Sequence, residues 1–119
     1  MTNQNQKTDI LAVKLVPGPN GAPIGKVIRV RDVNKAIEKN VTSNFEEAAT
    51  RSVDVAFDLP VNVVFSLSSM GRVIDFANVY FIGPVMIFGK DYDGCVCSLT
   101  RAQIHAIAYF CASFRYSEE

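Results

Sequence analysis

The chain has 119 residues, of which 49% are hydrophobic, and its twelve basic residues are balanced by twelve acidic ones. Zero net charge argues against a protein whose affinity comes mainly from neutralising many phosphates, and no apolar run approaches the ~20 residues of a membrane span. The polar start and the odd number of cysteines, three, predict a cytoplasmic protein without a disulfide framework.

The hydrophobic pattern predicts an α+β fold. We expect an N-terminal hairpin, one or two short helices, an antiparallel β-meander of about four strands, and a C-terminal helix packed on the sheet. Residues 1–8 are predicted to be a disordered arm, and residues 9–116 to form a single α+β domain.

The first half of the chain predicts a hairpin followed by helix. Apolar residues alternate over 11–15 and again over 27–31, on either side of a segment, 16–25, with three prolines and three glycines. From Asp32, a suitable N-cap, the period changes to three or four residues over 33–48. Weak helix formers in the middle of that run leave open whether it is one helix or two.

Residues 53–67 carry an apolar side chain at every odd position, which predicts one long bent strand with a buried odd face. Pro60 lacks an N–H to donate and is expected at an edge or a bulge. The chain should return as a single strand over 73–82, with one face made of Ile74, Phe76, Tyr80 and Ile82. Residues 85–88 are apolar on both faces and belong in the middle of a sheet or under a partner.

The C-terminal helix has the clearest local signals. Thr100 and Gln103 fit a capping box, and Leu99 is placed to pack against Ile104. An apolar stripe predicts that the helix continues to residue 114 and packs on the sheet; it consists of Ile104, Ile107, Ala108, Cys111 and Phe114.

A metal or thiol site is the first chemical hypothesis. Cys95, Cys97, His105 and Cys111 are metal-capable, but six residues of helix rotate by about 240°, which places His105 and Cys111 on different sides. A thiol nucleophile assisted by His105 is the second hypothesis. No group of polar residues has a sequence spacing that predicts an active site, so an enzyme is the least favoured class of protein. We therefore predict no catalytic residues and no cofactor.

The favoured function is a small non-enzymatic assembly or protein-binding module. One sheet under one helix leaves apolar surface that a second copy would cover, so we expect a homo-oligomer, most simply a dimer, or docking on another protein. The residues expected at this interface belong to the second face of the sheet: Val64, Val79, Phe81, Val85 and Ile87.

The alternative is a single-stranded nucleic-acid-binding protein. Its contacts would come from the N-terminal hairpin through Lys14, Lys26, Arg29 and Arg31, joined by Lys35 and Lys39. The order of four strands and a helix over 53–114 resembles in outline the single-strand-binding sheets of transcription coactivators and Whirly proteins, a likeness of fold without a shared motif. If a partner covers the second face of the sheet, the assembly function is favoured. If that face is exposed to water beside the basic hairpin, nucleic-acid binding is favoured.

Overall fold

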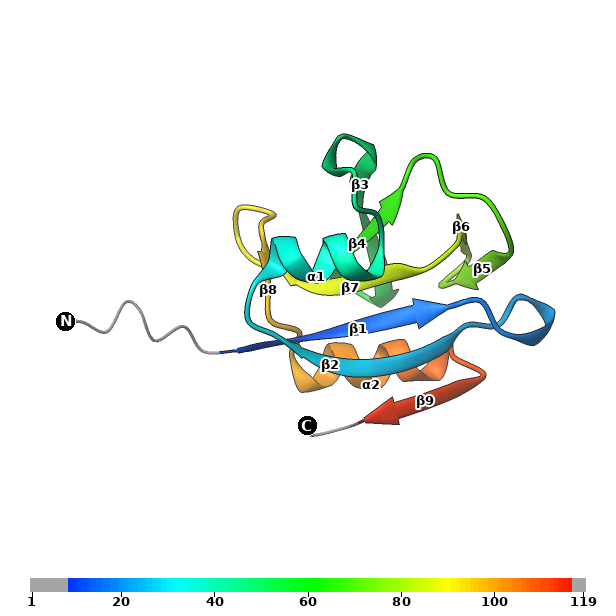
Figure 1. The fold of residues 1–119 in the computed structure, drawn as a ribbon. Coiled ribbons are helices and arrows are strands. Elements are labelled where there is room, and N and C mark those ends of the chain that lie inside the picture. Colours follow the sequence, from blue (N-terminus) through cyan, green and yellow to red (C-terminus); the bar gives the residue numbers. More distant parts are fainter. Residues whose placement is uncertain (1–8, 117–119) are drawn as a thin grey trace.

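A computed structural model describes residues 9–116, and within this range the chain is mostly β-structure with two α-helices (Figure 1). The arm predicted for residues 1–8 lies outside the described residues. The main sheet contains β1 (Ile10–Val16), β2 (Ile24–Val30), β3 (Ala48–Ala56), β4 (Leu59–Ser66), β7 (Val85–Lys90), β8 (Val96–Cys97) and β9 (Ser113–Tyr116). The remaining elements are β5 (Val73–Phe76), β6 (Val79–Ile82), α1 (Val33–Asn40), α2 (Arg101–Tyr109) and the 3-10 turns η2 (Pro19–Gly21) and η3 (Phe45–Glu47).

The main sheet has seven strands in the order β3-β4-β7-β1-β2-β9, with β8 paired to β7. Neighbours are antiparallel except β2 and β9, which run parallel. The prediction of an α+β fold with a four-strand meander is therefore wrong, because the structure is mostly β with a seven-strand mixed sheet and a separate two-strand sheet. Antiparallel pairing does dominate. The N-terminal hairpin is part of the same sheet, because β7 returns between β4 and β1.

The predicted long strand is a hairpin, β3 and β4, with its turn at Phe57–Asp58. Val53 pairs with Val61, so odd residues pair with odd ones and share a face. The alternation of apolar and polar residues therefore stays in phase across the turn. For this reason the turn cannot be recognised from the sequence pattern. Phe57 is fully exposed at the turn instead of buried. The predicted bulge is confirmed, since the register shifts beside Pro60.

The segment predicted as one strand over 73–82 is also a hairpin, β5–β6, and it forms a two-stranded sheet of its own. Its turn, Ala77–Asn78, has both residues at positive φ, as a tight two-residue hairpin requires. Ile74 pairs with Phe81, so an even residue shares a face with an odd one. As a result Phe81 is buried, whereas Tyr80 and Ile82 are exposed, contrary to the predicted faces.

Each face of the main sheet has its own cover. On one face, the odd-numbered valines of β3 and β4 pack with Ile104 and Ile107 of α2 and with the inner side of β5–β6. On the other face, Met86 and Phe88 pack with Ile37 of α1. The odd face is therefore buried as predicted, and α1 supplies the second cover within the same chain.

The capping box of α2 is confirmed, with Thr100 as N-cap and Gln103 bonding back to its N–H. The helix, however, ends at Tyr109 and does not reach residue 114. Phe114 belongs to β9, where it lies opposite Gly25 of β2. After α2 the chain pairs as a strand with the free edge of β2. This pairing is possible because residue 25 has no side chain where the Phe114 ring lies.

The segment 33–48 contains one α-helix, α1, followed by the separate 3-10 turn η3. Asp32 caps α1 as predicted, by accepting a hydrogen bond from the Lys35 N–H at 3.1 Å. No helix within residues 9–116 has the length and apolarity to cross a membrane.

Candidate functional site

The residues predicted to form a partner interface lie largely inside the chain. Val64, Phe81, Val85 and Ile87 are buried, and Val79 is half-buried. Val64 packs in the cluster under α1, and the other four pack in the cluster under α2 and β5–β6. These side chains therefore offer little surface to a second molecule.

The cysteines and His105 do not form a reactive or metal-binding group in the described part of the chain. His105 is exposed on α2, and no set of three or more His, Cys, Asp or Glu residues within 9–116 is placed to hold a metal ion. Burial raises the pKa of Cys111 to about 11. Burial, followed by the negative charges of Asp91 and Cys95, also raises the pKa of Cys97. These thiols stay protonated at neutral pH, unlike a nucleophile or a metal ligand.

All the basic residues predicted for nucleic-acid binding line one hollow between β2 and α1, of about 460 Å³, which we call the basic groove. Lys14 and Lys26 are paired neighbours on β1 and β2. Lys35 and Lys39 stand one turn apart on α1, so both reach the same side of the helix. The six cations of the groove are Lys14, Lys26, Arg29, Arg31, Lys35 and Lys39, above the apolar Ile28, Val30 and Ala36.

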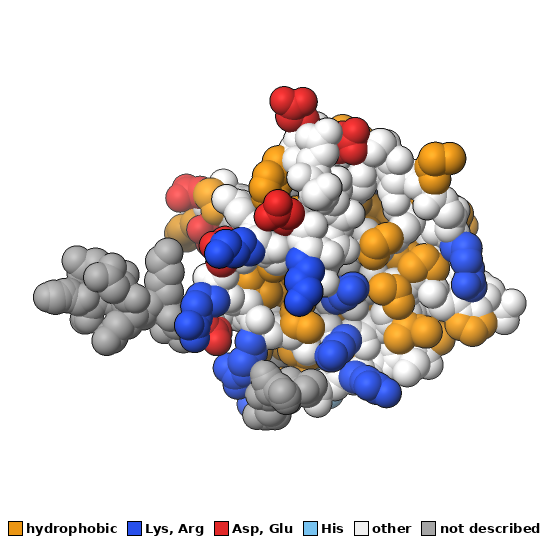
Figure 2. All heavy atoms as spheres, in the orientation of Figure 1, with side chains coloured by type: hydrophobic (Ala, Val, Ile, Leu, Met, Phe, Trp, Pro, Cys, Tyr) orange, Lys and Arg blue, Asp and Glu red, His pale blue; other side chains and the backbone are white. Residues whose placement is uncertain are grey.

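The charge of the basic groove is strongly one-sided although the chain as a whole is neutral. Asp32 is the single carboxylate among its lining residues, and it caps α1. Arg31 forms an ion pair with Asp9 at 3.2 Å, and within residues 9–116 no other groove cation has an ion-pair partner. Arg115, opposite Lys26 on β9, extends the positive surface. Figure 2 shows Lys and Arg side chains gathered over β1, β2 and α1.

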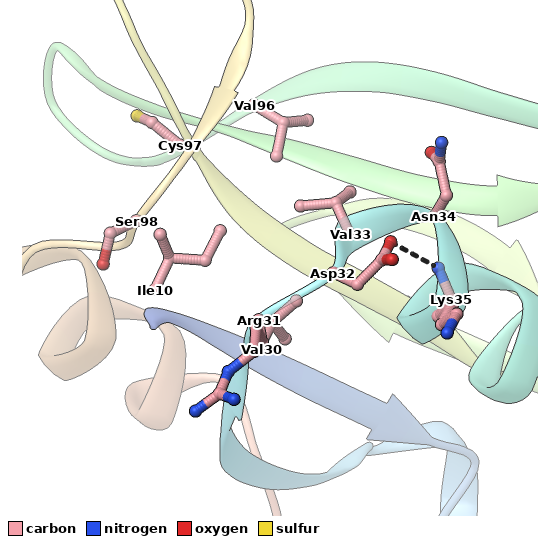
Figure 3. A pocket seen from close by; sticks show the side chains of 10 residues that line it. All are labelled: Ile10, Val30, Arg31, Asp32, Val33, Asn34, Lys35, Val96, Cys97 and Ser98. Atoms are coloured by element: carbon pink, nitrogen blue, oxygen red, sulfur yellow. Dashed lines mark hydrogen bonds between the residues drawn. The ribbon is translucent and has the colours of Figure 1, made fainter. Parts of the chain in front are cut away.

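A second hollow of about 940 Å³, the end pocket, opens where β1, β8 and the start of α1 meet (Figure 3). The side chains of Ile10, Val33 and Val96 gather in it, with Asn34 at the α1 side and Cys97 and Ser98 at the β8 side. Four of its residues also line the basic groove, namely Val30, Arg31, Asp32 and Lys35. The two hollows therefore adjoin along the segment that joins β2 to α1.

Sequence reasoning missed the end pocket because its apolar walls come from three distant segments. Ile10 precedes the first alternating segment, Val33 begins the run with helical period, and Val96 lies far along the chain from both. Pairing of β8 with β7 and of β1 with β7 brings these segments together. The only signal in the sequence was the unbroken apolar run of β7, which had to lie centrally.

An exposed apolar surface occupies the outer side of the β5–β6 hairpin and the loop before it. We call it the hairpin patch, and it consists of Leu67, Met70, Val73, Tyr80 and Ile82. Val73 and Ile82 are paired neighbours, and Tyr80 is 72% exposed. Leu67, Tyr80 and Ile82 also border a shallow hollow of about 240 Å³. Large apolar side chains grouped in this way are typical of contact surfaces.

Comparison of the chain with models of protein families, with curated proteins and with solved structures finds no match.

Proposed function

We propose that the protein binds nucleic acid through the phosphate backbone at the basic groove. The observation that carries this proposal is the convergence of six cations and one carboxylate on a single hollow of a chain without net charge. The two functions predicted from the sequence thereby change order, because the residues expected at a partner interface are largely buried in the chain itself. The cytoplasmic location predicted from the sequence is compatible with this ligand.

The chemistry of the groove fits phosphate oxygens. Lysine and arginine side chains act only as hydrogen-bond donors. Five of the six are exposed, so an anion can reach them without rearrangement of the core. The groove contains no aromatic ring among its lining residues. Backbone charge, and not base stacking, is therefore the interaction that the groove itself offers.

The number of cations sets the expected salt dependence. If five or six phosphates are neutralised on a single strand, the logarithm of the association constant falls with log salt by about 0.7 per phosphate. Affinity should then drop roughly 100- to 300-fold between about 50 and about 200 mM salt.

The test is fluorescence anisotropy of a labelled oligonucleotide over a range of salt concentrations. Lys26→Glu and Lys35→Glu should each weaken binding by about tenfold at low salt and reduce the salt slope by about one. Arg101→Glu is the matched control, because it makes the same change in charge on α2, which covers the opposite face of the sheet. Equal weakening by all three variants, or no binding at low salt, would contradict the proposal.

We propose a second function, self-association, because of the hairpin patch. A two-stranded hairpin with an apolar outer side gains stability when a second copy covers it. Light scattering should give a dimer for the unmodified chain and a monomer for Tyr80→Asp. Tyr92→Asp is the control, since Tyr92 is fully exposed in a loop outside the patch. A monomer at every concentration would rule out this function.

A further inference from the structure

We propose that the bound nucleic acid is single-stranded and that the end pocket receives one unpaired base while the basic groove holds the adjoining phosphates. This inference rests on the proposed function, keeps the single-stranded ligand expected from the sequence, and adds to it a site for one base.

The end pocket and the basic groove adjoin and share lining residues. Arg31 and Lys35 line both hollows, so a phosphate bound between them has one neighbouring nucleotide in the groove and the other at the mouth of the end pocket. Figure 3 shows these two residues on the segment that runs from β2 into α1, beside the apolar walls. A strand that follows the cations therefore delivers a base to this opening.

The end pocket matches a nucleic-acid base in chemistry and in size. The walls formed by Ile10, Val33 and Val96 are aliphatic and accept the flat apolar faces of a base. The Asn34 amide stands at the same hollow and offers a donor and an acceptor to the edge of the base, whereas the Asp32 carboxylate is engaged with the Lys35 N–H. At about 940 Å³ the hollow lies within the usual range of small-ligand sites.

An intact duplex is a poorer ligand for this arrangement than a single strand. In a duplex the base faces are stacked and the pairing edges are occupied, so a base reaches a pocket only after it leaves the helix, which carries an energetic penalty. In a single strand the bases are already free to turn outward. The combination of a phosphate track and an adjoining apolar pocket therefore favours the single strand.

The ligand itself supplies the first test. Three labelled oligonucleotides are compared in buffers of equal salt: a single strand, the same strand without bases, and the corresponding duplex. The single strand should bind at least about tenfold more tightly than the abasic strand, in keeping with a contact to a single base. It should also bind more tightly than the duplex.

Native thiols supply the second test, because Cys97 lines the end pocket and Cys95 does not. Alkylation by N-ethylmaleimide is followed by mass spectrometry of peptides, which separates these two thiols from Cys111. Cys95→Ala is used to follow Cys97, and Cys97→Ala is used to follow Cys95. The single strand should slow alkylation of Cys97 about tenfold or more and leave Cys95 within about twofold, whereas the abasic strand should protect neither.

The outcomes separate the two proposals. Tighter binding of the single strand together with protection of Cys97 supports the base site. Equal binding of all three oligonucleotides with Cys97 unprotected overturns the base site and leaves the phosphate groove standing. Tighter binding without protection of Cys97 also overturns it, because the base then lies elsewhere. Absence of binding overturns both proposals.

Discussion

Replacing Gln103 with alanine tests how α2 is attached to the sheet. Gln103 is a buried polar residue in the first turn of the helix. Its side-chain oxygen accepts a hydrogen bond from the Thr100 N–H at 2.8 Å, and its side-chain nitrogen donates to the Pro60 carbonyl at 3.0 Å. One side chain thus closes the capping box and links α2 to β4 beside the bulge.

The expected loss follows from these two bonds. Each contributes about 0.5–1.5 kcal/mol, and the substitution removes the Gln103 donor from the Pro60 carbonyl in a partly buried position. We expect Gln103→Ala to lower the free energy of unfolding by about 2–3 kcal/mol. Thr100→Ala removes only the cap and should lower it by about 1 kcal/mol. The difference between the two variants reports on the link to Pro60.

The assay is urea unfolding followed by circular dichroism, applied to both variants and to the double variant. The double variant should lose less than the sum of the single losses, because both residues belong to one capping box. If Gln103→Ala loses no more stability than Thr100→Ala, the bond to Pro60 contributes nothing and the reasoning is refuted.

Three further predictions use the same unfolding assay. Gly89→Ala should lower stability by about 1–3 kcal/mol, because an added Cβ would stand 2.3 Å from the backbone oxygen of Ser98; an unchanged midpoint would contradict this. Ile107→Ala should lose about 2–5 kcal/mol and Phe114→Ala less, since Ile107 is fully buried and Phe114 half-buried on β9; equal losses would argue against this packing. The pKa of Cys111 is raised from 9.0 to about 11, so the folded state keeps its proton where the unfolded state loses it, and stability should fall as pH rises through this interval. Cys111→Ala should remove this part of the pH dependence, and a variant with an identical pH profile would show that the thiol does not contribute.

The sequence by itself determined the features that depend on near neighbours. The capping box of Thr100 and Gln103 follows from a three-residue spacing, and the bulge beside Pro60 follows from its missing N–H. The buried odd face of β3 and β4 follows from a period of two. Alternation and charge on the first hairpin likewise identified Lys14 and Lys26 as candidates for a basic surface.

Only the tertiary structure decided where strands end and what covers them. The two-residue turn joins Ala56 to Leu59, and the register shift beside it restores pairing between residues of equal parity. The alternation therefore stays intact, and Phe57–Asp58 looked like part of one strand. Insertion of β7 between β4 and β1 joins segments that are far apart in the sequence. This insertion creates the end pocket, and it places α1 over Met86 and Phe88. Such long-range pairing depends on how well surfaces from distant parts of the chain fit together. The periodicity of one segment carries no information about that fit. The same packing encloses the residues that looked like a partner interface and leaves the basic groove open.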